Sequence, residues 1–486
     1  MTTKLNIIPS PKSICCSTDT LEYTTIPAAI SVVSSDLATA GEAFSDIAKK
    51  LYDVEIASGD GIIVKKNGSL ASGEYTLAVD GSVFIEVGDL DGATYALSTL
   101  IQIMEKCEGG ISVPKVKISD KPDCAYRTLM VDLARQWHPF DKLLGYVDLC
   151  FLYKIKFLHL HFTDTQSYTL PSDKFPKIPT LDRHYSKEQI AELNEYAKAK
   201  NIEIIPEFDV PGHARPMVTA YPELFANVPT GVESEEEFAL FFADIKQNVI
   251  CVGKEGVMDT LKILAKEIID MFPYSRYLHI GGDEANIGEW KNCRTCQEYM
   301  ERNGIDGPRP LYTHFIKLMT DIVLDLGKTP IVWEGFPREG SEEISREVIV
   351  TAWESYYHLA PELIEEGFKI TNASWEPLYT VPAGHRVVES GRWYPDDIMD
   401  WNLYTWKNWN AKTAAYEKPI VIEPTEQVLG ATFCAWENNY DAEINTVREN
   451  LAAMSEKVWN ISSTVTKEEM KASLEKILPL AEKLTK

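Results

Sequence analysis

Long apolar segments are missing from this sequence. Residues 1–20 contain no apolar core of the length that signal peptides need, and no later run approaches the roughly 20 residues of a membrane-spanning helix. We therefore expect a protein without a membrane partner, and the cytoplasm is its expected location.

Positive charge is also scarce. The chain has 48 Lys and Arg against 73 Asp and Glu, a net charge of -25. Such a surface repels phosphate groups, which makes nucleic acids and anionic membranes poor candidate partners. The acidity by itself says nothing about the substrate.

Cysteines are few and show no paired pattern. The nine cysteines are an odd number and are scattered along the chain, as is usual in a reducing compartment. Cys293 and Cys296 form one C-x-x-C pair, but a metal or redox site would need partners at matching spacing and no second pair exists. We interpret the two as reduced thiols on a helix, and we expect no cofactor and no metal.

Two regions of the 486 residues differ in pattern. Residues 1–120 contain short alternating runs, such as Glu74–Val79 and Ser82–Val87, followed by the amphipathic stretch Gly92–Glu105. Strands followed by a helix predict a small α+β domain. This region has no histidine and no clustered carboxylates in an apolar frame, so we expect it to be non-catalytic.

Residues 121–465 alternate short apolar runs with helical stretches. The runs are Thr128–Leu133, Ile155–Phe162, Ile202–Phe208, Tyr277–Ile280, Pro330–Trp333, Val348–Trp353, Lys369–Ala373 and Ala431–Trp436, and the helical stretches include Ser186–Lys200, Lys254–Met271 and Arg309–Leu326. Eight buried parallel strands separated by helices predict an α/β fold, a (β/α)8 TIM barrel. Residues 466–486 begin with a Thr-x-x-Glu cap and predict a C-terminal helix packed on the barrel.

Residues that are costly to bury follow these runs, at the strand ends where such barrels have their active sites. They are Asp132, Arg135, His161, Asp164, Glu207, Asp209, His213, Asp283 and Glu284, and three later runs end in Trp333, Trp353 and Trp436, each followed by Glu. Asp283 and Glu284 follow His-Ile-Gly-Gly, and glycines there allow close backbone approach to a ligand. An apolar, aromatic site readily raises the pKa of one such carboxyl group and keeps it as a general acid. The tryptophans suit the apolar faces of a sugar.

The same strand ends allow a metal-dependent TIM-barrel hydrolase as an alternative. His159-x-His161 is a pattern that can hold a divalent metal ion, with His213, His279 and Asp283 as further ligands. Against this alternative, the stronger local pattern is His161-x-x-Asp164, and no later run offers a convincing additional histidine. A third alternative is a carbohydrate-binding protein without catalysis.

The motifs resemble those of glycoside hydrolase family 20, the β-N-acetylhexosaminidases, over nearly the whole chain. The resemblance rests on Tyr126-Arg127-x-Leu-Met-Val-Asp132, His161-Phe-Thr-Asp164-Thr-Gln166, Pro206-Glu-Phe-Asp-Val-Pro-Gly-His213 and His279-Ile-Gly-Gly-Asp-Glu284 in this order, with Tyr95–Gln102 in the small domain and Ser455-Glu-Lys-Val-Trp459 near the end. It implies a retaining exo-enzyme that removes terminal N-acetylhexosamine units from a glycan by substrate-assisted catalysis, one of the exceptions to the two-carboxylate scheme.

The resemblance also implies a role for each site residue. Glu284 would be the general acid and base, and Asp283 would orient the acetamido group for attack through an oxazoline intermediate. The substrate-binding residues would be Arg127, which grips ring hydroxyls O3 and O4, Tyr379, which donates to the acetamide oxygen, and the box of Trp333, Trp353 and Trp436. Asp164 and His213 would form a buried relay, supported by His161 and Asp209. Family members commonly pair through barrel faces, so a homodimer is a further hypothesis.

Two positions depart from the family pattern. This chain has Val381 after Tyr379-Thr where the family has Asp, and Trp436-Glu437-Asn438 where the family has Trp-x-Glu. The missing carboxylates normally hold O4 and O6, so we expect Glu437 and Asn438 at this edge of the sugar. A 6-sulfated or galacto-configured ring, contacted by His385 or Arg386, is the corresponding hypothesis.

Overall fold

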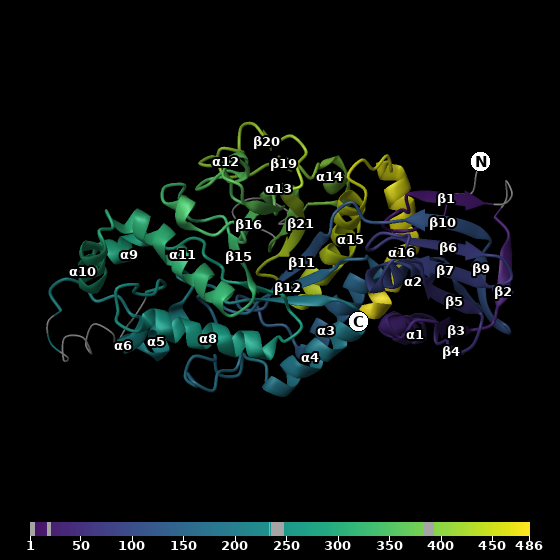
Figure 1. The fold of residues 1–486 in the computed structure, drawn as a ribbon, viewed down its shortest axis with the longest axis horizontal. Helices are drawn as coiled ribbons and strands as arrows, with labels where there is room; N and C mark the ends of the chain where they lie inside the picture. Colours follow the sequence, from purple (N-terminus) through teal and green to yellow (C-terminus); the bar gives the residue numbers. More distant parts are fainter. Residues whose placement is uncertain (1–4, 17–20, 233, 235–246, 383–392) are drawn as a thin grey trace.

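Eight parallel strands close into a barrel in a computed structural model that describes residues 5–16, 21–232, 234, 247–382 and 393–486 (Figure 1). They are β11 (Tyr126–Asp132), β12 (Phe157–His161), β13 (Glu203–Glu207), β14 (Tyr277–His279), β15 (Thr329–Trp333), β16 (Ile349–Ala352), β17 (Lys369–Asn372) and β21 (Val428–Ala435). Neighbours in sequence pair in parallel, and β21 pairs with β11 to close the ring. Each predicted run overlaps one strand, so the predicted TIM barrel is confirmed.

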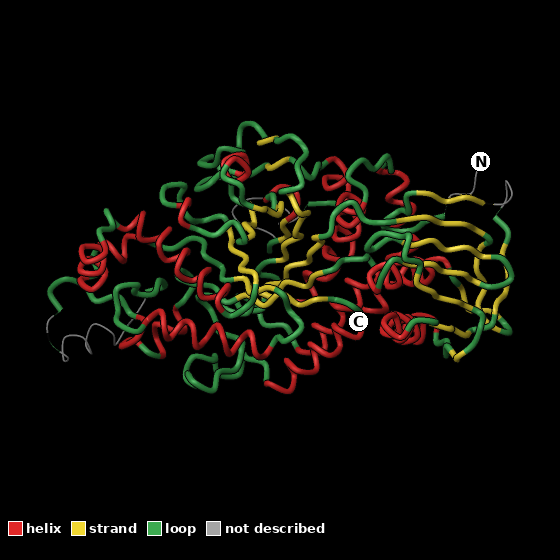
Figure 2. The backbone as a smooth tube through the Cα atoms, viewed as in Figure 1, coloured by secondary structure: helices red, strands yellow, loops and turns green. Residues whose placement is uncertain are grey.

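Helices lie along the outside of the barrel (Figure 2). They are α3 (Phe140–Leu152), α4 (Lys187–Ala199), α5 (Arg215–Ala220), α6 (Pro222–Phe225), α8 (Val257–Met271), α9 (Ile287–Lys291), α10 (Arg294–Asn303), α11 (Pro308–Asp325), α12 (Ala360–Glu365), α13 (Trp375–Leu378), α14 (Pro395–Asp400) and α15 (Tyr440–Trp459), with a 3-10 turn η2 (Ser341–Glu343). The predicted helical stretches correspond to α4, α8 and α11.

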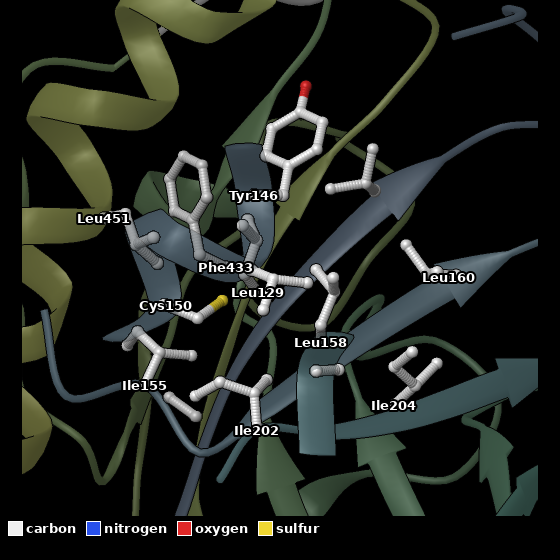
Figure 3. Close-up of a cluster of buried hydrophobic side chains, with 14 of the residues drawn as sticks. Leu129, Tyr146, Cys150, Ile155, Leu158, Leu160, Ile202, Ile204, Phe433 and Leu451 are labelled. Carbon is white, nitrogen blue, oxygen red and sulfur yellow. The ribbon is translucent and has the colours of Figure 1, made fainter. Parts of the chain in front are cut away.

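The barrel wall is apolar toward the helices. Figure 3 shows Leu129, Leu158 and Ile204 from three adjacent strands beside Leu451 of α15 and Cys150 of α3. These side chains are buried, and they alternate along each strand with residues that point into the barrel. Burial on both faces is why the strands appear in the sequence as nearly continuous apolar runs.

Two short pairings lie near the carboxyl ends of the barrel strands. β18 (Tyr379–Thr380) pairs in parallel with the end of β21, beyond the part of β21 that pairs with β17. The pair β19 (Thr405–Trp406) and β20 (Ile420–Val421) lies in the segment that precedes β21. β18 therefore places Tyr379 level with Cys434, close to the carboxyl ends of the strands.

The N-terminal domain has a mixed sheet of seven strands in the order β1-β10-β6-β7-β5-β3-β4 and a smaller sheet, β2-β9-β8. The strands are β1 (Ser13–Cys16), β2 (Tyr23–Ile26), β3 (Ala29–Val32), β4 (Ala57–Ser58), β5 (Ile62–Lys66), β6 (Tyr75–Val79), β7 (Val83–Val87), β8 (Glu105–Cys107), β9 (Gly110–Pro114) and β10 (Val116–Asp120). The helices are α1 (Ala38–Tyr52), preceded by the turn η1 (Ser35–Leu37), and α2 (Leu90–Ile103). The two helices lie between the large sheet and the barrel, in contact with α3 and α4 (Figure 1).

The C-terminal helix α16 (Lys467–Leu484) lies at the junction of the two domains. Thr466 and Glu469 form the predicted capping box. The helix packs on α3 and α15 of the barrel and also on α1, where the Lys483 ammonium donates to the Leu51 carbonyl. None of the described helices combines the length and the apolarity that crossing a membrane requires.

Candidate active site

A pocket opens at the carboxyl ends of the barrel strands and encloses about 280 Å³. It is lined by Arg135, Asp283, Glu284, Trp333, Trp353, Glu354, Trp375, Tyr379, Val381, Asn408, Trp409, Asn410, Trp436 and Glu437. Its volume is slightly below the roughly 300–1,000 Å³ that is usual for ligand pockets, and its lining combines aromatic rings with carboxyl groups. Such a pocket suits one small, partly polar ligand unit.

A sharp turn after β14 presents Asp283 and Glu284 to this pocket. Gly281 has φ +65°, and a Cβ there would lie 1.8 Å from Asp209 Oδ1, so the backbone passes Asp209 more closely than any side chain would allow. The Gly282 amide donates to Asp209 Oδ1 at 3.2 Å, and the buried Tyr312 hydroxyl donates to the Gly282 carbonyl at 2.5 Å. Both the amide and the carbonyl of Gly282 are thereby held in place.

The two carboxyl groups have different surroundings. Asp283 is 8% exposed, whereas the Glu284 side chain is 47% exposed and has Oε2 3.4 Å from His213 Nε2. Burial raises the pKa of Asp283 to about 7, although the nearby His213 opposes this rise. The His213 imidazole lowers the pKa of Glu284. The sequence predicts a raised pKa for the general acid, Glu284. In the structure the carboxyl group with the raised pKa is that of Asp283, because Asp283 is more deeply buried and Glu284 lies beside a cation.

The predicted relay is assembled around Asp164. Its carboxylate lies 3.1 Å from His213 Nδ1 and 3.0 Å from His161 Nε2, and it accepts from Arg135 Nε at 2.6 Å. Although burial opposes the change, Asp164 and Asp209 raise the pKa of His213 well above its ordinary value, and His213 and Arg135 keep the pKa of Asp164 well below its own. His213 is therefore held as a cation between Asp164 and Glu284.

Beneath the pocket, the barrel interior is polar. Glu207 lies 2.8 Å from both His159 Nε2 and His161 Nδ1, and it accepts from Trp333 Nε1 at 2.7 Å. Burial, together with the nearby Asp283, raises the pKa of Asp209 well above its ordinary value. These contacts fix the Trp333 ring and the floor of the pocket.

Several of these groups lie close enough together to hold a metal ion. Within the described part of the chain, ligand atoms lie within 4.8 Å of one another in the sets His159–Glu207–His279, His161–Glu207–Asp209 and Asp209–His213–Asp283. In the first two sets the Glu207 carboxylate already contacts histidine and tryptophan N–H groups, and in the third His213 Nδ1 already contacts Asp164. Protein partners thus engage Glu207 and His213 Nδ1, whereas His279 Nε2 and Asp283 Oδ1 have no hydrogen-bond partner among the described residues.

Four predicted aromatic residues surround the pocket. The ring centroids of Tyr379 lie 6.2 Å from Trp353 and 6.5 Å from Trp436, and those of Trp333 and Trp436 are 6.0 Å apart. Trp353 Nε1 donates to the Glu334 carbonyl at 2.7 Å, which orients its ring. Residues more than 100 positions apart thus form one aromatic wall.

Arg127 is not in the pocket. Arg127 is the second residue of β11, at the amino end of the strand, and its side chain points out of the barrel. Its guanidinium donates to the carbonyls of Lys154 and Cys124 and to the Tyr95 hydroxyl. The expectation that Arg127 grips the sugar is wrong for this reason: it lies at the opposite end of the strand from the pocket. Arg135, three residues after β11, lines the pocket instead.

At the edge of the pocket where we expect the O4 and O6 side of the sugar, one predicted residue, Asn438, is absent from the lining. Val381 and Glu437 line it, and Glu437 accepts from Arg135 Nη1 at 2.7 Å. Asn438 does not line it; its side chain turns back and donates to the Trp436 carbonyl at 3.3 Å. His385 and Arg386 lie outside the described residues.

Sequence reasoning missed five lining residues and left Arg135 without a role. The five are Glu354, Trp375, Asn408, Trp409 and Asn410. Trp401–Asn410 is dense in tryptophan and asparagine, which could have identified it as a ligand-binding loop. Glu354 follows the end of β16; burial, together with the nearby Glu284, raises its pKa to about 8.

Comparison with known families finds two matches that together span most of the chain. Residues 124–462 match the catalytic domain of glycosyl hydrolase family 20, and residues 4–121 match domain 2 of the same family.

Individual relatives are similar over part of their length. A beta-hexosaminidase of Porphyromonas gingivalis is 29% identical over 358 residues, which are 68% of this chain and 45% of that protein. A beta-hexosaminidase of Akkermansia muciniphila is 32% identical over 267 residues, 51% of this chain and 52% of that protein. The chain thus spans about half the length of these curated relatives.

Solved structures show the same fold. An exo beta-N-acetylglucosaminidase of Vibrio harveyi, in complex with N-acetylglucosamine, superposes with a TM-score of 0.82 at 22% identity, covering 99% of this chain and 77% of that one. A beta-N-acetylhexosaminidase of Bacteroides fragilis gives 0.79 at 21% identity, with 98% and 96% covered. At these sequence identities the similarity shows a shared fold and nothing further.

Proposed function

The chain belongs to glycosyl hydrolase family 20, and we propose that it is a retaining exo-β-N-acetylhexosaminidase that removes terminal N-acetylglucosamine or N-acetylgalactosamine from glycans. One observation carries the proposal: Asp283 and Glu284 stand side by side in an aromatic pocket, one buried and one half-exposed beside a cationic histidine. Two carboxyl groups so placed can hold an N–H group and transfer a proton. The beta-hexosaminidase names of the relatives support it.

In the proposed reaction the substrate supplies the nucleophile. Asp283 accepts a hydrogen bond from the acetamide N–H, which directs the acetamide oxygen at the anomeric carbon. As that C–O bond forms, the glycosidic C–O bond breaks and Glu284 gives its proton to the leaving oxygen. Glu284 then takes a proton from water, which attacks the anomeric carbon, opens the oxazoline ring and leaves the product with retained configuration.

The pKa directions fit these roles once the sugar is in place. The acetamide N–H stabilises the charged form of Asp283, which opposes the effect of burial on its pKa. The sugar also covers the exposed face of Glu284, and desolvation favours the neutral forms of the Glu284–His213 pair, with the proton on Glu284. The buried Asp164 keeps His213 in position throughout.

The lining favours an uncharged sugar. Among the described lining residues, Arg135 is the one cationic side chain, and it already pairs with Asp164 and Glu437. A sulfate group would face Asp283, Glu284, Glu354 and Glu437. We therefore propose that plain N-acetylhexosamines are preferred over 6-sulfated ones, with Val381, Asn408 and Asn410 at the edge where epimers differ.

The sharpest test is the turnover of an aryl N-acetyl-β-glucosaminide by the wild type and by Glu284→Gln. The amide cannot donate the catalytic proton, so we expect kcat/KM to fall by about 10²- to 10⁴-fold. Glu301→Gln, on the exposed face of α10, is the matched control and should retain wild-type turnover. Equal turnover by Glu284→Gln and the wild type would overturn the assignment of the acid, whereas no turnover by either protein would favour a protein that binds carbohydrate without hydrolysing it.

Metal-dependent hydrolysis is the second candidate, and the Asp209–His213–Asp283 set is the observation that favours it. Incubation with EDTA followed by assay separates the two mechanisms. Substrate-assisted hydrolysis should be unaffected by the chelator and strongly inhibited by a thiazoline mimic of the oxazoline. Loss of activity that added metal restores would support the metal mechanism instead.

A further inference from the structure

Three buried cysteines meet where the segment that follows β13 contacts the start of helix α10. Cys251 Sγ lies 3.5 Å from Cys293 Sγ and 3.4 Å from Cys296 Sγ, and all three sulfurs lie within 4.8 Å of one another. Cys293 and Cys296 are the C-x-x-C pair that lacked a partner in the sequence. The fold supplies the partner from 42 positions away.

We propose that Cys251, Cys293 and Cys296 bind one Zn²⁺ ion as thiolates, at a site separate from the reaction centre. A tetrahedral zinc ion about 2.3 Å from each sulfur holds its thiolates about 3.8 Å apart, near the observed spacings. A disulfide would require about 2.05 Å between two of the sulfurs. Binding releases one proton from each of the three thiols.

The surroundings suit thiolates. The Val228 amide donates to Cys293 Sγ at 3.3 Å, and the Thr295 hydroxyl lies 3.0 Å from Cys251 Sγ and 3.1 Å from Cys293 Sγ. Cys293 caps the N-terminus of the ten-residue helix α10, and Cys296 is in its first turn, where the helix dipole favours negative charge. Hydrogen bonds to the ligand atoms are common at metal sites, because they orient the ligands.

A fourth ligand is required, and oxygen is what the site offers. Asn227 Oδ1 lies 3.6 Å from Cys296 Sγ, and the Asn227 amide is oriented by donating to the Val249 carbonyl at 2.7 Å. Within the described residues no fourth Cys, His, Asp or Glu joins the three thiols in one ligand set. The proposed coordination is therefore three thiolates and one neutral oxygen, from Asn227 or from water.

The ion would join the two loops that carry the pocket's acidic residue and its histidine. Cys293 and Cys296 lie in the segment that follows Glu284, and Cys251 lies in the segment that follows β13 and His213. Hydrogen bonds already connect these loops: Arg294 N donates to the Val228 carbonyl, and Trp290 Nε1 donates to the Ile250 carbonyl. The Ala214 amide donates to the Asn248 carbonyl, so the cysteine loop also contacts the chain beside His213.

Metal analysis of the full chain, expressed with zinc in the medium, tests the proposal directly. We expect about one zinc ion per chain, released when a mercurial titrates the thiols and detected with a chromogenic chelator. Cobalt in place of zinc should give the absorption of a tetrahedral thiolate site. Purified protein without metal, or a mass two hydrogens lower than the reduced chain, would overturn the proposal in favour of free thiols or a disulfide.

Single variants locate the ion. Cys251→Ala, Cys293→Ala and Cys296→Ala should each lose the zinc, while Cys150→Ala, at a buried thiol of α3, should keep it. We expect the three variants to unfold at lower temperature than the wild type and still to hydrolyse substrate well below that temperature. Zinc retained by all three would overturn the proposal.

This outcome is independent of the proposed hydrolase activity. The zinc content of the wild type is measured without an activity assay, so it tests whether the zinc site exists even if a cysteine variant fails to fold. Loss of zinc with turnover intact would also separate this structural role from a metal-dependent reaction.

Discussion

Arg135 connects the buried relay to the wall of the pocket. Its guanidinium donates to Asp164 and Glu437 and lies over the Trp436 ring, 4.8 Å from the centroid. A planar, forked cation in this position can also donate to ring hydroxyls of a sugar. Lysine carries the same charge but cannot make these contacts together.

We therefore expect Arg135→Lys to raise KM. The loss of one charge-assisted hydrogen bond, about 1.5–3 kcal/mol, corresponds to roughly 10- to 100-fold in kcat/KM. Steady-state kinetics on an aryl N-acetyl-β-glucosaminide measure it. Arg276→Lys, at the amino end of the barrel, is the control and should leave both constants unchanged. An unchanged KM for Arg135→Lys would exclude it from sugar binding.

The pH dependence of kcat/KM reports the ionisation of groups in the free enzyme. The pKa of Asp283 lies within the pH range in which activity can be measured. Because burial raises the pKa of Asp283 to about 7, the protonated, inactive form accumulates as the pH falls. We expect kcat/KM to decrease below about pH 7 and to level above it on this limb.

Removing the cation at position 213 should move this limb. His213 lowers the pKa of both Asp283 and Glu284, so His213→Asn should raise both values and shift the acidic limb to higher pH. The same profile for His314→Asn, at a histidine on α11 that pairs with Tyr299, should match the wild type. A limb that stays in place in His213→Asn would show that another group controls it.

At the scale of single elements, the turn between β14 and Asp283 is the most constrained segment of the site. Gly281 and Gly304 have nearly equal φ values, +65° and +64°. A Cβ at Gly304 would meet nothing within 4 Å, whereas at Gly281 it would overlap Asp209. Alanine substitutions at these two glycines therefore separate the cost of a left-handed backbone conformation from the cost of a steric overlap between the new Cβ and Asp209.

We expect Gly304→Ala to cost about 1–2 kcal/mol, the penalty of a left-handed conformation alone. Gly281→Ala should cost more and should also lower kcat, because the turn must move away from Asp209 and carry Asp283 and Glu284 with it. Denaturant unfolding and initial rates measure the two effects. Equal stability and normal kcat in both variants would contradict this view of the turn.

The order of the eight barrel strands and of several helices between them could be predicted from the sequence. Runs such as Ile155–Phe162 and Ile202–Phe208 are apolar on both faces because barrel strands are buried on both, and this pattern is local. The elements not predicted include helices α1, α3 and α15, most strands of the N-terminal domain and the short strand β18. β18 has two residues and forms only because it pairs with the end of β21. The two segments are far apart in sequence, so no local pattern predicts this pairing.

At the scale of the whole molecule, Arg127 belongs to the junction between the domains. The Trp459 ring lies under the Arg127 guanidinium and donates from Nε1 to Asp120 at 2.9 Å. Asp120 also pairs with the fully buried Lys154 at 3.2 Å, and the Tyr95 hydroxyl of α2 accepts a hydrogen bond from Arg127 Nη2. Strand β10, helix α2 and helix α15 thus meet around one arginine.

We expect Arg127→Met to destabilise the protein and leave KM unchanged. The carbonyl and hydroxyl acceptors left unpaired cost about 2–3 kcal/mol, which calorimetry would detect as a lower unfolding temperature. Arg309→Met, on the surface of α11, should change neither quantity. A raised KM with unchanged stability would restore Arg127 to the sugar site.

The sequence by itself determined the barrel, the two-domain organisation, the family and the pair Asp283–Glu284. Each depends on patterns among residues close together in the chain: apolar runs, glycines before carboxylates, and motifs in a given order. Only the tertiary structure decided that Arg135 and not Arg127 lines the pocket, that Asp283 has the raised pKa, and that Cys251 joins the C-x-x-C pair. These depend on which end and face of a strand a side chain occupies and on distances between residues far apart in sequence, because burial and electrostatic interactions act through space.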